Sequence, residues 1–145
     1  MIENTNQNVT NNVNYPYKRK VKSKIVVVLE GKSDNRGLNL INTRSRALCK
    51  NEIHEIIISD EADAGPGKIV NSISYLGFVE IIEGGVILTG DNIYLNDKLI
   101  GYVAGYDETH FPNHINIVLY SENRLTGLEI GTNVDDLLYF INCSN

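Results

Sequence analysis

The chain has 145 residues and a mass of 16.2 kDa; 42% of its residues are apolar and 21% are charged. This size suits a single domain, and the composition excludes disordered, collagen-like, coiled-coil, membrane-spanning and disulfide-scaffold proteins. Cys49 and Cys143 are far apart and form no C-x-x-C pair, so we expect two reduced thiols. No secretory signal pattern and no apolar run of ~20 residues occur, which predicts a cytoplasmic protein with no membrane partner.

The net charge of −5 is divided unevenly along the chain. Residues 1–50 carry ten Lys and Arg against three acids (+7), whereas residues 51–145 carry three against fifteen (−12). Three hypotheses fit: the basic part pairs with the acidic part inside the molecule, it forms an arm for anionic partners, or it contacts a second subunit. Nucleic-acid-binding proteins usually have a basic body, so we favour internal pairing or a homo-oligomer and expect no nucleic-acid partner.

The first half of the chain divides into a tail and several short elements. Residues 1–16 are rich in Asn and have little to bury, which predicts a flexible tail, or one clamped by a neighbouring subunit, before a single domain over 17–145. The predicted elements are then a strand with alternating lysines (17–24), a buried strand (25–29), a loop (30–37), a strand (53–59), an acidic turn (60–67) and a short helix (68–76).

The second half reads as strands that recur every eight to twelve residues. The predicted strands are 78–82 and 86–89 as a hairpin around Gly84-Gly85, 92–95 and 98–106 around the turn Asn96-Asp97, then 114–121, 125–130 and 137–141. This rhythm predicts an all-β protein, a small antiparallel barrel of six to eight strands with room for one short helix.

The segment from Asp107 to Asn116 holds the densest group of functional side chains. Pro112 argues against a helix here, so we predict a loop that leads into a strand. Along that strand His114 and Asn116 share one face, and Ile115, Ile117 and Leu119 share the other. We expect the apolar face to point inward and the polar face to meet a ligand or a subunit. The candidate ligand-binding residues of this segment are Asp107, Glu108, His110, Asn113, His114 and Asn116.

Imidazole and carboxylate groups bind zinc or another divalent ion, and they also transfer protons near neutral pH. His110 and His114 are therefore the candidate metal ligands, and a divalent metal is the candidate cofactor. A structural role competes with this hypothesis, because Asp107 and Thr109 can cap their own loop and a histidine entering a strand can bond a backbone carbonyl.

A second polar segment places three carboxylates within four residues: Asp60, Glu61 and Asp63. Such carboxylates repel one another unless a cation, backbone amides or solvent relieves them. The calcium-loop pattern and its closing Glu are missing, so a solvated turn before a helix competes with a ligand-binding role. We expect this turn and the 107–116 loop to converge in space as one site.

Residues 84–140 carry a loose pattern of turn and core positions: Gly90–Ile93, Ile100–Gly105, Asn113–Ile117, Ile130-Gly131 and Asp136–Phe140. In this pattern, about two fifths of the chain resembles the glucitol/sorbitol-type IIA component of the sugar phosphotransferase system, a small β-barrel family. The resemblance implies a barrel. The phospho-accepting histidine of that family follows a Phe-Ile pair, and the counterpart here is Phe78-Val79 followed by Glu80. A glutamate does not accept and pass phosphate as that histidine does.

Three hypotheses for function remain open. The leading one is a non-catalytic cytoplasmic module that binds a small molecule or assembles as a homo-oligomer. The second is a small metal-assisted or acid–base enzyme that uses His110, His114 and a carboxylate of the two polar segments. The third is an anion- or nucleic-acid-binding protein that uses the lysine strand; only Tyr15 and Tyr17 lie near these lysines in sequence, which is thin for a stacking platform.

Overall fold

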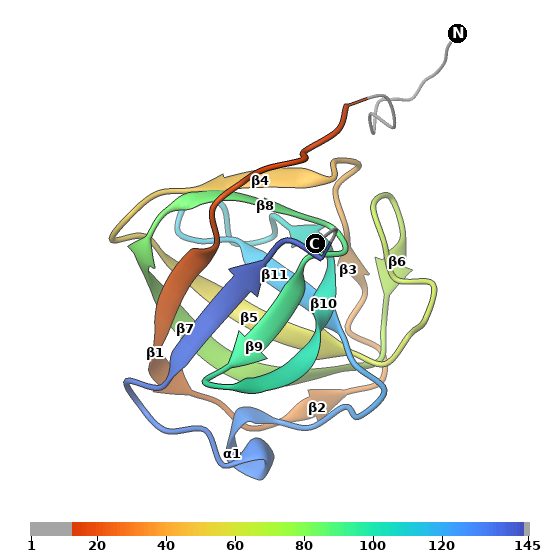
Figure 1. Ribbon diagram of the computed structural model, residues 1–145. Coiled ribbons are helices and arrows are strands. Elements are labelled where there is room, and N and C mark those ends of the chain that lie inside the picture. The colour runs from red at the N-terminus through yellow and green to blue at the C-terminus, as the bar shows by residue number, and fades with distance from the viewer. Residues whose placement is uncertain (1–12, 144–145) are drawn as a thin grey trace, which may run out of the picture.

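Most of the strands predicted from the sequence lie in one sheet that closes into a ring, and two further pairs of strands form small sheets of their own (Figure 1). The structure is a computed structural model and describes residues 13–143. Its elements in this range are β1 (Val21–Val28), β2 (Lys32–Ser33), β3 (Leu38–Asn39), β4 (Ser45–Leu48), β5 (Ile53–Ser59), β6 (Ile69–Val70), β7 (Ile73–Glu83), β8 (Gly85–Leu88), β9 (Asn92–Leu95), β10 (Lys98–Asp107), β11 (Asn116–Tyr120), α1 (Gly127–Ile130) and β12 (Leu137–Ile141).

The ring closes because β1 pairs with β12 on one side and with β7 on the other. Within the described residues the order β1, β12, β9, β10, β11, β5, β7 returns to β1, and the two-residue β2 adds to β7. The predicted all-β class with six to eight strands and a short helix is confirmed. One correction concerns direction: β11 and β5 run parallel, with Asn116 opposite Glu55 and Tyr120 opposite Ser59.

The centre of the ring is filled by every second residue of its strands. On β1, β12 and β9 these inward residues are fully or nearly buried: Val21, Ser23, Ile25, Leu138, Phe140, Ile93 and Leu95. Their apolar members join the inner residues of β5, β7, β10 and β11 in one cluster. Burying each such aliphatic or aromatic side chain contributes roughly 1.5–3 kcal/mol, so the closed sheet is the main source of stability.

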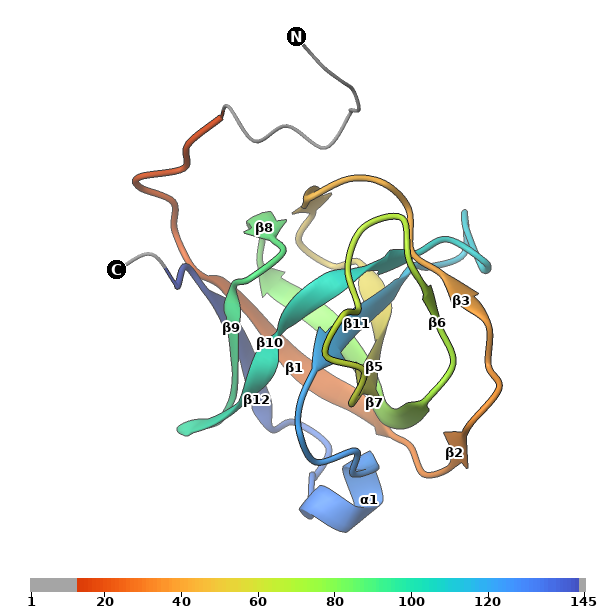
Figure 2. The ribbon, with the colours of Figure 1, turned by 90° about the vertical axis from the view of Figure 1, so that its right-hand side faces the viewer.

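A second layer covers the outer face of β10, β11 and β5. The ribbon of β3 and β6 lies over these strands (Figure 2) and forms a separate apolar cluster with them. This cluster contains Leu38, Leu40, Ile57, Val70, Ile73, Ala104 and Val118. Gly105 permits the close packing, because a Cβ at this position would lie 2.9 Å from Cδ1 of Leu40. These three strands are therefore buried on both faces over the length that the ribbon covers.

Two predicted elements around β7 are wrong. The predicted helix over 68–76 is instead β6 and the beginning of β7, because Val70 and Ile73 pack into the second apolar cluster. The predicted hairpin at Gly84-Gly85 does not form: β7 pairs with β1, β5 and β2, whereas β8 pairs with β4. A Cβ at Gly84 would lie 2.5 Å from the carbonyl oxygen of Leu48, so the chain needs glycine where it leaves the ring.

The predicted strand over 125–130 is also wrong, because most of these residues form α1. Thr126 caps this helix: its hydroxyl accepts from the Glu129 N–H, and the Glu129 carboxylate accepts from the Thr126 N–H. This reciprocal capping box satisfies two backbone donors and favours a helical turn. In the part of the chain that the structure describes, no helix has the length and apolar character to cross a bilayer.

The basic first segment is partly matched by acids inside the molecule, as the internal-pairing hypothesis expects. Lys22 and Lys24 face outward on β1, opposite Glu83 and Glu80 of β7. Lys18 forms a buried ion pair with Asp91. Most of the predicted 1–16 tail lies outside the described residues.

Candidate functional site

The predicted loop between β10 and β11 borders a small polar pocket. The loop extends from the ends of these two strands (Figure 2). It contacts β4 through the ion pair of Glu108 with Arg46 and contains a cis Phe111-Pro112 peptide bond. The pocket, called here the histidine pocket, has a volume of about 190 Å³. Its lining residues come from β4, the beginning of β5 and the loop: Arg46, Glu52, Ile53, His54, Phe111, Pro112, Asn113, His114 and Ile115.

His54 and Glu52 form the β5 wall of the histidine pocket. Nδ1 of His54 accepts a hydrogen bond from the Ile115 N–H at 3.1 Å, and because a backbone N–H only donates, the ring proton lies on Nε2. That proton is donated to Oε1 of Glu52 at 3.0 Å. Burial raises the pKa of Glu52, but the hydrogen bonds from His54 and the Cys49 N–H and the charge of Arg46 outweigh it and give a net lowering. Glu52 is therefore an ionised group whose orientation is fixed.

His114 forms the opposite wall and has one unused nitrogen. Its Nδ1 accepts from the side-chain amide of Asn113 at 2.8 Å, so the ring proton lies on Nε2. This Nε2 is buried and has no hydrogen-bond partner among residues 13–143. Burial lowers the pKa of His114, and the nearby His110 and His54 lower it further. The ring is held as a neutral imidazole that directs an N–H into the protein.

Glu55 lies behind His114, on the outer face of β5. Its Oε1 is 3.5 Å from Nε2 of His114, and its side chain is only 11% exposed. Burial raises the pKa of Glu55, and the charge of Asp107 adds to this, although the charges of His110 and Arg36 act against it. The pKa of an acid and that of a base at close range are thus shifted toward each other, an arrangement that is common at functional sites.

Aromatic rings pack against His114 on two sides. Phe78 of β7 meets it edge to face at a centroid distance of 5.2 Å, and the exposed His110 stacks on it at 5.0 Å with an interplanar angle of 26°. Two stacked imidazoles do not direct their nitrogen lone pairs to a common point. Among residues 13–143, no group of three or more His, Cys, Asp and Glu side chains could hold a metal ion. The predicted metal site at His110 and His114 has no geometric support.

Asp107 and Asn116 are structural residues beneath the β3–β6 ribbon. The Asp107 carboxylate accepts from the Asn39 N–H at 3.2 Å, the Thr109 N–H at 2.9 Å and the Asn116 side-chain amide at 3.0 Å. Asp107 is 1% exposed and Asn116 is fully buried. The predicted sharing of faces along β11 is confirmed, since Ile115, Ile117 and Leu119 point into the ring. The predicted exposure of Asn116 is wrong, because the second layer covers that face.

The other wall of the pocket combines a cation with an exposed ring. Arg46 of β4 forms an ion pair with Glu108 at 2.7 Å, and its guanidinium lies 5.8 Å from the ring centroid of Phe111. Phe111 is 59% exposed. Glu108 therefore has a partner within the protein and holds Arg46 against the loop.

The acidic turn does not join this site. Asp60 follows Ser59, which pairs with Tyr120, whereas the histidine loop precedes Asn116 at the other end of the same parallel pair. The carboxylate of Glu61 accepts the N–H groups of Asn71 and Ser72 at 2.7 Å each and so closes its own turn. Asp60 and Asp63 are exposed. The predicted shared site of the two polar segments is wrong.

Several residues of the site do not stand out in the sequence: Arg46, Glu52, His54, Glu55 and Phe111. One signal was available, because His54-Glu55 interrupts an otherwise apolar strand whose two faces are both buried. Buried polar side chains in such a strand need hydrogen-bond partners from other segments, so the pair indicates a polar cluster around it. Arg46 and Phe111 gave no signal, since neither stands in a local motif.

Comparison with known proteins places the chain in a family but gives it no activity. No curated protein and no solved structure matches it. A family model described as a family of unknown function (DUF6917) matches residues 15–141, which is most of the chain. The chain therefore belongs to this family of unknown function, DUF6917.

Proposed function

We propose that the chain is a module that binds a small, polar, uncharged molecule in the histidine pocket. The observation that carries this proposal is the polar lining around His114, a ring that burial holds neutral and whose Nδ1 accepts a hydrogen bond from the Asn113 amide. A concave site with a few oriented polar groups is the usual form of a small-molecule site.

The charges in the pocket favour an uncharged ligand. Arg46 is already paired with Glu108, and Glu52 accepts from His54 and the Cys49 N–H. A ligand with a net charge would have to compete with these partners. A neutral molecule needs only hydrogen bonds to the same groups and an apolar edge that contacts Phe111.

The test is a screen of neutral hydrogen-bonding metabolites by amide chemical shifts in NMR. We expect a binding compound to move the signals of residues 46, 52–54 and 111–115 together. Phe111→Ala should weaken binding about tenfold through the lost contact. The matched surface variant Leu128→Ala, which removes an exposed apolar side chain from α1 outside the pocket, should not change it. Compounds that move other signals only, or no binder in the screen, would contradict the proposal.

A second candidate function is acid–base catalysis. The observation in its favour is the 3.5 Å approach of Glu55 to His114, with the pKa of the acid raised and that of the base lowered. Glu55 does not line the pocket, so His114 would act as the base: its Nδ1 would take a proton from the substrate while the proton on Nε2 passes to Glu55. Any turnover found with ester, phosphoester or enolisable carbonyl substrates should disappear in both Glu55→Gln and His114→Gln. Turnover that survives either change would contradict this candidate.

The predicted homo-oligomer and cytoplasmic location remain proposals. Exposed Ile53 and Phe111 at the rim of the pocket, 47% and 59% exposed, supply apolar surface for a contact with a second copy. Sedimentation equilibrium of the full chain tests this. A monomer at all concentrations up to ~100 μM would contradict the assembly part, since such a contact would then be weaker than most specific interfaces.

A further inference from the structure

Four tyrosines gather on the outer face of the ring, although they come from four different strands. Tyr139 of β12 lies opposite Tyr94 of β9, and Tyr94 lies opposite Leu99 of β10. Tyr102 of β10 lies opposite Tyr120 of β11, with ring centroids 5.2 Å apart. Leu99 is 52% and Tyr102 is 38% exposed, and the other three rings are half-buried. We call this surface the tyrosine face.

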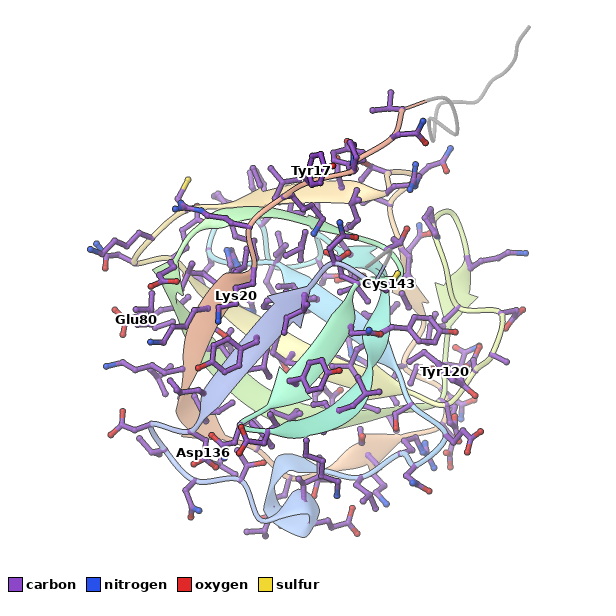
Figure 3. All side chains as sticks on the ribbon, in the orientation of Figure 1. Tyr17, Lys20, Glu80, Tyr120, Asp136 and Cys143 are labelled. Carbon is purple, nitrogen blue, oxygen red and sulfur yellow. The ribbon has the colours of Figure 1, made fainter. Side chains whose placement is uncertain are left out.

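The basic strand β1 borders the tyrosine face. Lys22 of β1 lies opposite Tyr139, and Nζ of Lys20 lies 5.0 Å from the centroid of the Tyr139 ring. Figure 3 shows Lys20 above this face and Tyr120 at its far edge. In the sequence only Tyr15 and Tyr17 lie beside these lysines. Closure of the ring adds Tyr139 and Tyr94 from distant parts of the chain.

Acidic residues are scarce on these strands in a chain that has 18 acids. The strands β1, β12, β9, β10 and β11 contain one acid, Asp107, which is 1% exposed and lies under the β3–β6 ribbon. Acids lie at the borders instead. Glu80 and Glu83 lie across β1 on β7, and Asp97 and Asp136 lie beside the end of α1. Figure 3 labels Glu80 and Asp136. The tyrosine face is thus a basic and aromatic area on an acidic protein.

We propose that the tyrosine face binds single-stranded nucleic acid. Its bases would stack on the tyrosine rings, and its phosphates would lie along Lys20, Lys22 and Lys24. Stacking on aromatic side chains combined with a basic track is the general chemistry of single-strand binding. From β12 to β11 the rings span three strand spacings, on the order of 14 Å, which is enough for several bases. A duplex hides the faces of its bases, so it is not the expected ligand.

The acids near this face limit the affinity. Glu83 and Glu80 lie directly opposite Lys22 and Lys24 across the β1–β7 pair, within the Debye length of about 8 Å, and they reduce the positive potential of these two lysines. More distant acids are largely screened at physiological salt. Binding in the micromolar range is expected, with a strong dependence on salt. This site is independent of the histidine pocket, which lies beyond the ends of β10 and β11.

The test uses the full chain and 5′-fluorescein dT12 and rU12 in fluorescence anisotropy between about 20 and 200 mM NaCl. Tyr102→Ala and Tyr94→Ala should each weaken binding about tenfold, and Tyr94→Phe should bind as the unchanged protein does. Lys20→Gln combined with Lys22→Gln should reduce the slope of log affinity against log salt by about 1.4. Lys68→Gln, an exposed lysine outside this face, is the matched control and should have no effect.

The proposal would be overturned by no binding at the lowest salt concentration, by binding that both Tyr102→Ala and Tyr94→Ala leave unchanged, or by binding that Lys68→Gln weakens as much as the β1 double variant does. Salt-independent binding of neutral oligosaccharides at the same tyrosines, in place of the oligonucleotides, would assign the face to a carbohydrate and also overturn it. Thermal melting followed by circular dichroism verifies that each variant is folded. Because Tyr102 is exposed, Tyr102→Ala should leave the core intact, so weaker binding by this variant reports on the tyrosine face itself.

Discussion

Nε2 of His114 lies 3.5 Å from Oε1 of Glu55, and no hydrogen bond connects them. The two residues are brought together by the parallel pairing of β11 with β5, which places Asn116 beside Glu55. Burial acts on both groups in the sense that favours the neutral form, since it raises the pKa of the acid and lowers that of the base. The fold therefore favours the neutral form of each group and disfavours its charged form. This preference makes the free energy of unfolding depend on pH, which can be measured.

Glu55→Gln should preserve or increase the free energy of unfolding at neutral pH. Because the folded-state pKa of Glu55 lies above its ordinary 4.5, the folded protein binds this proton more readily than the unfolded chain. The stability that Glu55 contributes is full below pH 4.5 and is lost as the pH rises through the folded pKa. The amide carries no charge, so the gain should appear at neutral pH and vanish in acid. Urea unfolding at several pH values measures this, with the exposed Glu122→Gln as control; a loss of stability at neutral pH would contradict it.

His114→Gln should make the free energy of unfolding fall less steeply as the pH is lowered below neutral. The folded pKa of His114 lies below its ordinary 6.5, so the unfolded chain takes up this proton first. The contribution of His114 is full above pH 6.5 and is lost as the pH falls through the folded pKa. Unfolding free energies of both proteins on either side of pH 6.5 give the comparison. An unchanged slope in the variant would show that His114 is not the buried neutral ring described above.

Strands with clear alternation could be predicted well from the sequence. The bounds 53–59, 92–95 and 137–141 match β5, β9 and β12, and the Asn96-Asp97 turn is where it was expected, with Asn96 at φ 54°. The strands β9 and β12 alternate between buried and half-buried residues, and β5 contains the apolar run Ile56–Ile58. Both patterns favour a strand. The helix signal of Thr126-x-x-Glu129 was also present in the sequence, but the apolar residues around it, Leu125, Leu128 and Ile130, suggested a strand instead.

The second layer could not be predicted, and it determines the site. Its strands β3 and β6 have two residues each, too few for any periodicity. Without them, His114 and Asn116 were expected on an open surface. With them, Asn116 and Asp107 become buried structural groups, while His114 at the edge of the ribbon keeps contact with the pocket. Glu55 was missed for the same reason, since its partners come from distant segments that only the fold brings together.

Asp107→Asn should lower the free energy of unfolding by about 2–4 kcal/mol. The Asp107 carboxylate now accepts from the Asn39 N–H, the Thr109 N–H and the Asn116 side-chain amide. The Asn amide would replace one acceptor oxygen by an NH2 group, which faces these donors and breaks charge-assisted hydrogen bonds. The neighbouring Glu108→Gln is the matched control, because its ion pair with Arg46 is partly exposed and its loss should cost under about 1 kcal/mol. Urea unfolding at neutral pH compares the two variants. Similar small losses in both would show that Asp107 does not fix the loop to the ribbon.

Gly77→Ala should destabilise the ring by about 2–3 kcal/mol or more. A Cβ at Gly77 would collide with the carbonyl oxygen of Val27 across the β1–β7 pair, and a backbone atom there moves only if the strands separate. Gly65→Ala is the matched control, because its Cβ would lie 3.9 Å from the carbonyl oxygen of Asp63, an ordinary van der Waals contact, and its φ is not in the left-handed region. The control should change the melting temperature little, and it could raise it, since alanine restricts the unfolded chain. Equal melting temperatures for Gly77→Ala and the unchanged protein would mean that β1 and β7 do not pack as closely as described, and closure of the ring would lose its main support.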